Sequence, residues 1–561
     1  YLYRMAGWDR PGSRESEQMD GSTQLSSLRR QSTIRELQHE TFDCVIIGAG
    51  ITGAGIAREA VRRGLSAALI EKDDFSAGTS SRSTKMIHGG LRYLAMGEVA
   101  LVRETARERK HVNRMAPHLA EPCWMVVPAR SRATLTKFRT GLTLYEKLGA
   151  VSKADLHRNW SGQTLADQFP LLDRKTYPYA CAYREYLTDD SRLVIANVRD
   201  AAARGAVVGN YLEVTGLATR QRKIRGVRCR CSQSGEEFVV EARTVVNAAG
   251  PWVEMVCRMD ESPVLGTKQT LHLAKGIHIS LPRDKLPVDH LLVMNTRDGR
   301  NIFTIPRGDV VFIGTTDNTF HAAPTLWPSV ERQEVDYLLQ PLTDYFAMAP
   351  LGAADCIAAW AGLRPLVEQP GKSSKEISRK EEIWLSEAGL ISIAGGKLTG
   401  YRLMGIEAVD QVCEVLARDL PATDDLPPLP GGDFSQSLLE LSQLLQQSSN
   451  LDAAACDRLV RLYGTEASDI VNLSTQPVLP GSSLIQGEVA WAVTMEAACT
   501  VADVVYRRTR AALYSTERCE IVEPIAKQMA TLLGWNAERT DREIAHTNRL
   551  LAADLEFQHT P

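Results

Sequence analysis

Three glycines and one carboxylate near the start of the chain have the residue types and spacing needed to bind a dinucleotide. Gly48, Gly50 and Gly53 follow an apolar run at residues 42–47, and Glu71 closes a second apolar run. In such a motif the first glycine permits a tight turn, the second lets the backbone approach a pyrophosphate, and the third lets a helix pack on a strand. Glu71 is placed to accept hydrogen bonds from ribose hydroxyls, and its charge disfavours the 2′-phosphate of NADP.

The elements that must position these groups are a strand, a glycine turn, a helix and a second strand. The start of the helix would offer free N–H groups and a positive dipole end to the phosphates. Glycine triplets also occur in ordinary tight turns. Here the apolar strand, the acid at the right distance and the helical spacing of Ile56, Ala57, Ala60 and Val61 together favour a nucleotide site. The motif itself leaves FAD and NAD open.

A second strand-to-helix glycine turn occurs far along the chain, at residues 390–402, and a strand-rich stretch at residues 272–317 lies between the two turns. Such a discontinuous nucleotide domain favours FAD, because helix N-termini at these turns can face the flavin atoms where negative charge appears on reduction. The predicted fold class is an α/β FAD-binding domain, Rossmann-like and discontinuous, with an inserted mixed or antiparallel-sheet substrate domain and an all-α C-terminal domain.

The domain boundaries follow from composition. Residues 1–40 are polar and are expected to form a loose arm outside the fold, and residues 41–419 hold the FAD-binding domain with the interleaved substrate domain. The proline- and glycine-rich residues 420–432 resist helix and strand alike and predict a linker. Residues 433–561 have helical apolar spacing and predict a helical domain. Among the expected strands are residues 206–214 and 223–231.

Composition limits the classes of function. Lys+Arg 65 against Asp+Glu 68 gives a net charge of −3, so no strong field favours nucleic acid, and we expect no nucleic-acid partner. The eleven cysteines include no CxxC pair, which favours a reduced, cytoplasmic protein, and no metal site is predicted. No apolar run reaches the ~20 residues of a membrane-spanning helix.

Several longer motifs resemble one enzyme family. They lie at residues 78–94, 247–252, 314–317, 360–366 and 395–399. Together they resemble the FAD-dependent glycerol-3-phosphate dehydrogenases, whose close relatives include glycerol-3-phosphate oxidases. The likeness covers roughly residues 42–515, and the helical C-terminal region also resembles the C-terminal domain of that family. It implies oxidation of sn-glycerol 3-phosphate to dihydroxyacetone phosphate, with electrons passing to FAD and, in the dehydrogenases, on to membrane quinone.

A phosphate dianion beside a flavin requires fixed cations, preferably guanidinium groups whose planar donors match phosphate oxygens. The candidates for substrate binding are Arg92, Arg364, Arg379 and Lys397. Each has a plainer interpretation: Arg92 could brace a helix, Arg379 could be a strand-surface charge, and Lys397 could cap nearby carbonyls. The family motifs favour the binding role, and Arg364 and Lys397 lie in the most specific of them.

Oxidation of an alcohol by hydride transfer also needs a base for the hydroxyl proton. His278 and His88 are the candidate bases, because imidazole titrates near working pH. A lone histidine is more often structural than catalytic. We favour His278 as the base and expect His88 to contact the phosphate or a hydroxyl, with Tyr93 and Thr399 donating hydrogen bonds nearby.

Further residues are expected to hold the cofactor. Thr79, Ser80, Ser81 and Lys85 can reach the pyrophosphate or the ribityl hydroxyls, although serines and threonines also serve as turn residues and helix caps. By resemblance, Gly250, Leu398 and Thr399 line the flavin, and the backbone at Val214 approaches the adenine.

A quinone-reducing enzyme without a spanning helix must lie on the bilayer. Residues 129–149 combine cations with apolar side chains and are a candidate face for peripheral contact with the inner side of the cell membrane, although an amphipathic helix packed on the protein's own core has the same pattern. The alternatives left open are an oxidase that uses O2 and makes hydrogen peroxide, a flavoprotein that oxidises an amino acid, and a flavin-bound scaffold or sensor. A homodimer is also left open.

Overall fold

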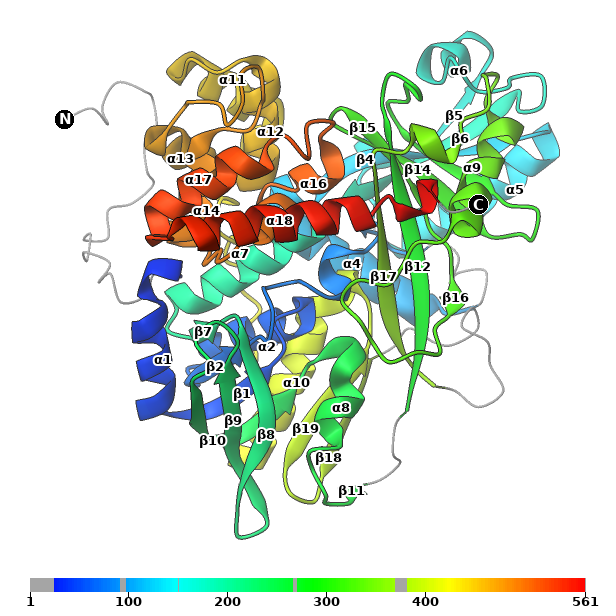
Figure 1. The fold of residues 1–561 in the computed structure, drawn as a ribbon. Helices are drawn as coiled ribbons and strands as arrows, with labels where there is room; N and C mark the ends of the chain where they lie inside the picture. Colours follow the sequence, from blue (N-terminus) through cyan, green and yellow to red (C-terminus); the bar gives the residue numbers. More distant parts are fainter. Residues whose placement is uncertain (1–24, 91–96, 150, 266–269, 369–380, 560–561) are drawn as a thin grey trace.

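The computed structural model describes residues 25–90, 97–149, 151–265, 270–368 and 381–559. Within these residues the strands form two large sheets, and the chain from Leu438 onward is helical (Figure 1). This architecture confirms the predicted fold class. The expected residues Arg92, Tyr93 and Arg379 lie outside the described residues.

The first sheet carries the nucleotide motif. Its strands run in the order β11-β18-β19-β10-β1-β2-β7, and β8 and β9 extend it from β10 as an antiparallel meander. Strands β19, β10, β1, β2 and β7 are parallel neighbours, so their carboxyl ends meet at one edge. The strands are β1 (Thr41–Ile47), β2 (Ala67–Ile70), β7 (Val207–Gly209), β8 (Leu212–Arg220), β9 (Lys223–Cys231), β10 (Glu237–Asn247), β11 (Val264–Leu265), β18 (Glu381–Ser386) and β19 (Leu390–Gly395).

The side chains of this sheet alternate between two apolar layers, one on each face. Cys44 and Ile46 of β1 pack in one core with α2 (Ile51–Arg62), α7 (Asp190–Ala203) and α10 (Tyr401–Leu416). Val45 and Ile47 pack in another core with α1 (Arg30–His39), β8 and β9. The predicted second glycine turn, between β19 and α10, therefore belongs to the same sheet as the first.

The second sheet is mostly antiparallel and carries the substrate side of the molecule. Its order is β16-β12-β15-β14-β13-β4-β6-β3, with β17 paired to β12 and β5 to β6. Within this second sheet, the β13–β4 pair is the only parallel pair among the described strands. The strands are β3 (Met86–Ile87), β4 (Glu121–Ala129), β5 (Arg158–Ser161), β6 (Tyr179–Leu187), β12 (Leu271–Pro282), β13 (Leu291–Asn295), β14 (Asn301–Arg307), β15 (Val310–Gly314), β16 (Asn318–Thr319) and β17 (Ala358–Val367).

Helices pack on both faces of the second sheet. One apolar core joins the sheet to residues of α6 (Gly162–Gln168) and α9 (Arg332–Tyr345). The core on the other face joins it to α4 (Val99–Met115), to α5 (Arg132–Leu148) and to helices of the C-terminal unit. A short helix, α8 (Val253–Cys257), follows β10.

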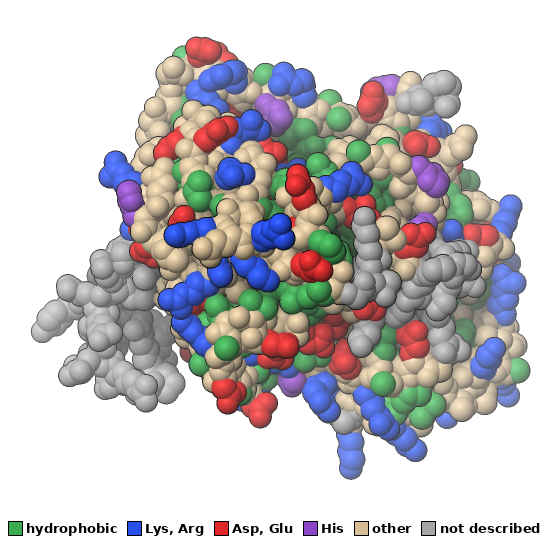
Figure 2. Space-filling view, turned by 90° about the horizontal axis from the view of Figure 1, so that it is seen from below, with side chains coloured by type: hydrophobic (Ala, Val, Ile, Leu, Met, Phe, Trp, Pro, Cys, Tyr) green, Lys and Arg blue, Asp and Glu red, His purple; other side chains and the backbone are tan. Residues whose placement is uncertain are grey.

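The C-terminal helical unit packs against the second sheet and pairs with Asp74 in the segment after β2 (Figure 1). Its helices are α11 (Leu438–Ser448), α12 (Ala453–Tyr463), α13 (Ala467–Leu473), α14 (Gln486–Met495), α15 (Val501–Asp503), α16 (Ala511–Tyr514), α17 (Val522–Leu533) and α18 (Ala537–Ala553). A π-helical turn, Val504–Arg508, lies between α15 and α16. Over the face seen in Figure 2, cationic and anionic side chains are interspersed, as the nearly neutral composition predicts.

Two expectations differ from the structure. The end of the expected loose arm is the helix α1, whose Ile34 and Leu37 are buried. The expected strand 206–214 is two strands, because Tyr211 has φ +55° and interrupts β7 and β8.

The amphipathic helix α5 is partly internal and partly exposed. Its apolar residues Leu142 and Tyr145 are buried against the protein's own core, while Leu144 is 49% exposed.

Candidate functional site

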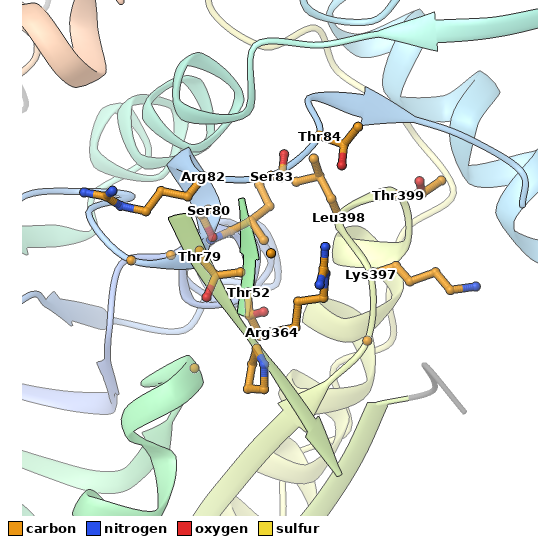
Figure 3. Close-up of a pocket in the computed structure, with 18 of the residues that line it drawn as sticks. Thr52, Thr79, Ser80, Arg82, Ser83, Thr84, Arg364, Lys397, Leu398 and Thr399 are labelled. Atoms are coloured by element: carbon orange, nitrogen blue, oxygen red, sulfur yellow. The ribbon is translucent and has the colours of Figure 1, made fainter. Parts of the chain in front are cut away.

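A cavity of about 910 Å³ lies between the two sheets and receives residues from both. From the first sheet it is lined by the glycine turn after β1, by Glu71 and by the turn after β19. From the second it is lined by residues of β4, β12, β13, β14 and β17, and the loop 79–85 crosses between the two sheets. In Figure 3 Thr79, Ser80, Arg364 and Leu398 converge on the middle of the view, whereas the side chains of Arg82 and Lys397 extend away from it. The volume lies within the range of small-molecule and cofactor sites.

The turn after β1 can only be built from glycine. Gly48 has φ +99°, and a Cβ atom there would lie 2.8 Å from the carbonyl oxygen of Ala248. A Cβ atom at Gly53 would overlap the carbonyl oxygen of Gly48. A Cβ atom at Gly50 would lie 3.1 Å from Ser80 Oγ, which accepts a hydrogen bond of 3.0 Å from the first amide of α2, at Ile51. The turn therefore brings backbone and a helix N-terminus to the cavity wall.

Glu71 stands at the carboxyl end of β2 and accepts two backbone hydrogen bonds. Its oxygens lie 2.7 Å from the amide nitrogen of Ala49 and 3.0 Å from that of Asp73. Burial raises the pKa of this carboxyl to about 7, against the two amides, which lower it. A hydroxyl pair of a ribose at this point would supply hydrogen bonds that favour the charged form.

The turn after β19 ties the two halves of the site together. Gly395 and Gly396 have φ +82° and +76°. Thr399 Oγ1 lies 3.2 Å from both the amide nitrogen and the carbonyl oxygen of His88. The segment that carries His88, from the second sheet, is thus held against the first sheet by one side chain.

His278 lies on β12, between β15 and β17 of the second sheet, and faces the cavity. Its imidazole stacks on the Trp360 ring with centroids 5.0 Å apart, and Nε2 lies 3.1 Å from Thr84 Oγ1. A Cβ atom on Gly314, its partner on β15, would overlap the imidazole ring. Burial, and then the charges of Lys85 and Arg364, lower the pKa of His278 well below its usual range, so the ring is neutral at neutral pH.

Arg364 lies on β17, the strand next to His278, and is held in one orientation. Its guanidinium pairs with Asp317 at 3.1 Å and donates to Thr315 Oγ1 at 3.0 Å and to the carbonyl oxygen of Thr316 at 3.3 Å. A Cβ atom on Gly276 would overlap the guanidinium. The side chain keeps 20% of its surface exposed toward the cavity. A fixed cation and a neutral imidazole thus share one wall.

Comparison with known proteins connects this geometry to a family. Residues 43–402 match the family model described as FAD dependent oxidoreductase, and residues 421–540 match the C-terminal domain of alpha-glycerophosphate oxidase. The chain is 38% identical over 464 residues to an aerobic glycerol-3-phosphate dehydrogenase of Staphylococcus haemolyticus, covering 80% of this chain and 83% of the relative. It is 34% identical over 553 residues to that of Staphylococcus aureus, covering 95% and 98%.

A solved structure agrees with the sequence relatives. The glycerol-3-phosphate dehydrogenase from Bacillus halodurans, complexed with FAD, superposes with a TM-score of 0.79 at 31% identity, covering 95% of this chain and 99% of that chain. The chain belongs to the family of FAD-dependent glycerol-3-phosphate dehydrogenases. The resemblance found in the sequence motifs is confirmed, and so is FAD as the cofactor.

The residues of this dehydrogenase-family chain fit FAD on local grounds as well. The glycine turn admits backbone where any side chain would clash, Ile51 opens a helix toward the cavity, and Glu71 is placed for a ribose. The buried Nδ1 atom of His278 has no hydrogen-bond partner among the described residues. These groups would hold the nucleotide at the first sheet and leave the flavin between the two sheets.

Most of the predicted site residues line this cavity. They are Gly48, Gly50, Glu71, Thr79, Ser80, Lys85, His88, Val214, Gly250, His278, Arg364, Lys397, Leu398 and Thr399. Two do not line it. Gly53 packs on the Gly48 carbonyl, as its predicted role requires. Ser81 is buried on the side of the loop away from the cavity, and its carbonyl accepts hydrogen bonds from Lys85 and Arg510.

Lys85 differs from its expected role in one respect. Its ammonium lies 3.0 Å from Asp190 Oδ1 and 2.8 Å from the Ser81 carbonyl, so it is engaged by the protein, not held out toward a pyrophosphate. Sequence reasoning missed Thr84, Trp360 and Asp317 as contacts of the candidate base and cation. All three stand in the family motifs at residues 78–94, 314–317 and 360–366, which was the available signal.

Proposed function

We propose that this chain oxidises sn-glycerol 3-phosphate to dihydroxyacetone phosphate and that the cavity between the two sheets is where it does so. The observation that carries the proposal is the shared wall formed by β12 and β17. Arg364 is paired across the two strands with Ala274, and His278 with Trp360, so a cation and a neutral imidazole face one cavity against two flavin-binding glycine turns. A small phosphorylated alcohol needs both groups.

Arg364 suits the phosphate. Asp317, Thr315 and the Thr316 carbonyl hold the guanidinium plane, so little rotamer freedom is lost when a phosphate binds this cation. We propose that Arg92, Arg379 and Lys397 complete the phosphate site and that Tyr93 donates a hydrogen bond to the substrate. Of these, Lys397 lines the cavity.

His278 suits the proton. Because burial and two nearby cations keep the imidazole neutral, it can accept the hydroxyl proton without first losing one. FAD, when bound, supplies acceptance of the C–H hydrogen as a hydride. The alternative base is His88, which also lines the cavity; Thr399 fixes its backbone.

The acceptor that fits the cavity best is a lipid-dissolved quinone. Toward α5 the cavity is lined mostly by apolar side chains, namely Val127, Phe138, Leu142, Leu144, Val293 and Phe303, together with Lys137. Such a lining favours an apolar acceptor over water-borne molecules. No helix among the described residues is long and apolar enough to span a bilayer. We therefore propose peripheral contact with the inner face of the cell membrane, through the exposed cations and Leu144 of α5.

The substrate is tested by product analysis. We expect purified, FAD-loaded protein with a dye acceptor to convert sn-glycerol 3-phosphate to dihydroxyacetone phosphate, and to leave glycerol unchanged because it offers no anion to Arg364. Oxidation of glycine or proline in place of the phosphate ester would instead select an amino-acid-oxidising flavoprotein. Absence of turnover with every small alcohol and amine would select a flavin-bound scaffold or sensor.

The acceptor is tested separately, under air. A dehydrogenase should pass electrons to a short-chain quinone and produce hydrogen peroxide in much less than stoichiometric yield. Peroxide formed mole for mole with dihydroxyacetone phosphate, without stimulation by quinone, would make the chain an oxidase.

A further inference from the structure

An arginine of the C-terminal helical unit reaches the loop that lines the flavin side of the cavity. Arg510 is fully buried, and its guanidinium donates to the Ser81 carbonyl and to Asp190 Oδ1, both at 3.0 Å. Its Nε atom lies 3.2 Å from Asp189 Oδ2. The backbone at Arg510 has φ +63°, a conformation uncommon for residues other than glycine. The contact of Arg510 with the loop therefore depends on the position of its guanidinium and on an uncommon backbone conformation.

Arg510 completes a buried cluster of carboxylates and cations. Asp189 and Asp190 open α7 and face Arg510 and Lys85, and Arg307 lies 3.9 Å from Asp189 Oδ2. The side chains of Asp189, Asp190, Arg510 and Lys85 are almost entirely buried. Buried charges of this kind are strongly destabilising when one partner is removed, because the remaining charge keeps its desolvation penalty.

The cluster holds the loop 79–85 at several atoms. Asp190 Oδ2 accepts hydrogen bonds from the amide of Ser83 at 3.0 Å and from its hydroxyl at 2.7 Å, while Lys85 and Arg510 share the Ser81 carbonyl. The next residue in the loop, Thr84, is the one that contacts His278. The Lys85 ammonium also lies 4.9 Å from the centroid of the Trp360 ring, on which His278 stacks.

We propose that Arg510 is a positioning residue of the redox site: acting through Asp190 and the Ser81 carbonyl, it sets where Thr84 and Lys85 stand against His278 and Trp360. The C-terminal helical unit thereby completes the site without touching the cavity, since Arg510 is absent from the cavity lining. Burial and the charge of Arg510 lower the pKa of Lys85 to about 7, which agrees with a coupling between the two groups.

The same unit contains a matched control. Arg518 is also buried and ion-paired, with Asp554 at 2.7 Å, and donates to the Ile357 and Leu551 carbonyls. Its hydrogen-bond and ion-pair partners, Ile357, Leu551 and Asp554, lie outside the loop 79–85 and outside α7. Arg510→Gln and Arg518→Gln therefore each remove one buried guanidinium from the same helical unit, and only the first removes it from the loop.

The first measurement is hydrogen–deuterium exchange of the full-length protein, with and without FAD. We expect Arg510→Gln to speed exchange of the peptide covering residues 79–87, where the Ser83 amide depends on Asp190, and Arg518→Gln to leave that peptide at the wild-type rate. This readout does not depend on turnover. Unchanged exchange in Arg510→Gln would overturn the proposal.

The second measurement rests on the proposed function and follows flavin reduction by sn-glycerol 3-phosphate in stopped flow. We expect Arg510→Gln to lower the limiting rate constant by about 10- to 100-fold, since a misplacement of about 1 Å can have an effect of that size. The substrate concentration for half-maximal rate should change by less than about twofold, because Arg510 makes no contact in the cavity. Arg510→Lys, which keeps the charge, should recover part of the loss.

The two readouts separate the possible failures. If wild-type protein is not reduced by sn-glycerol 3-phosphate, the proposed function fails while the exchange result still decides the positioning role. If Arg518→Gln slows reduction as much as Arg510→Gln at equal loss of thermal stability, Arg510 is only a packing residue. Should Arg510→Gln not fold, Arg510→Lys is compared with Arg518→Gln instead. A wild-type exchange rate together with wild-type flavin reduction in Arg510→Lys would contradict a requirement for guanidinium geometry.

Discussion

At the scale of single residues, the two central side chains of the site differ in charge. Arg364 is permanently charged and is fixed by three partners, whereas His278 is kept neutral by burial and by the cations around it. The pair therefore offers an anion site and a proton acceptor on neighbouring strands. Arg364 could be identified from the sequence because it stands in a family motif, whereas His278 was chosen only because imidazole titrates near working pH.

Replacing Arg364 tests the anion site. We expect Arg364→Ala to raise the sn-glycerol 3-phosphate concentration needed for half-maximal flavin reduction by about 10- to 150-fold, the effect of losing ~1.5–3 kcal/mol of charged hydrogen bonds. The flavin absorbance per mole of protein should stay at the wild-type value. The control is Arg332→Ala, an exposed arginine on α9 paired with Asp336. Loss of FAD in step with the loss of affinity would show that Arg364 serves the cofactor instead.

The pH dependence of flavin reduction tests the base. Because the pKa of His278 lies well below its usual range, the imidazole stays unprotonated until the medium is acidic, and loses its function only as pH falls through that low value. We expect the limiting rate constant, followed by stopped flow, to show no protonation step of the base near the ordinary histidine value of about 6.5. An acid limb centred there, retained in His278→Asn, would assign the base elsewhere, with His88 the first alternative.

Residue-level prediction was incomplete where a side chain acts through its surroundings. The roles of Gly48 and Gly53 could be predicted because only glycine fits there, while a Cβ atom at Gly50 would lie 3.1 Å from Ser80 Oγ. Thr84 and Trp360 stand in family motifs, but their relation to His278 exists only once two strands and a loop are brought together. The same holds for Lys85, whose partner Asp190 is distant in sequence.

At the scale of elements, close strand packing decides where the functional groups point. His278 faces Gly314 across β12 and β15, and Arg364 lies over Gly276 of the neighbouring strand. Both glycines leave room that a methyl group would fill. These are positions at which a small residue in a strand indicates close approach of another group.

Adding a methyl group at Gly314 tests this arrangement. We expect Gly314→Ala to displace the imidazole and lower the limiting rate of flavin reduction by about 10- to 100-fold, because proton transfer depends on positions within about 1 Å. FAD content should not change, since the nucleotide turn is remote from β15. Gly352→Ala is the matched control, because a Cβ atom there meets no described atom within 4 Å. Wild-type reduction by Gly314→Ala would contradict the assigned geometry.

Element boundaries were well predicted where the pattern is local. The expected strand at 223–231 coincides with β9, and both strand–glycine–helix units were found. The break between β7 and β8 was missed because Tyr211 is an unusual residue for a left-handed conformation. The helix α1 was missed because its sequence is polar apart from Ile34 and Leu37, which are the residues it buries.

At the scale of the whole molecule, the chain combines a nucleotide sheet, a substrate sheet and a helical unit into one redox site. The contribution of the helical unit could not be predicted from sequence. Arginines in a helical stretch are mostly found on the surface. Arg507, Arg508 and Arg510 are nevertheless buried, the first two paired with Asp74 after β2 and the third with Asp190 at the start of α7. Only the folded chain brings them to Asp74 and Asp190.

Membrane contact is also a property of the whole molecule. If α5 faces the bilayer, Lys137→Glu with Arg139→Glu should weaken binding to anionic vesicles by at least about tenfold, since each basic residue near such a surface contributes ~1 kcal/mol. Cosedimentation measures this. The control is Lys527→Glu with Arg549→Glu, which reverses two exposed cations on α17 and α18. Equal weakening by both pairs would point to net charge rather than to the α5 face.

The central claim is that a reducible flavin lies beside groups that recognise a small phosphorylated alcohol. Anaerobic titration of the purified, FAD-loaded protein with sn-glycerol 3-phosphate, followed by the visible absorbance of the flavin, tests it most directly. The account predicts that the absorbance is lost in proportion to added substrate, to one equivalent per flavin, and that glycerol leaves it unchanged. Flavin that keeps its colour with the phosphate ester, or that glycerol bleaches equally well, would contradict it.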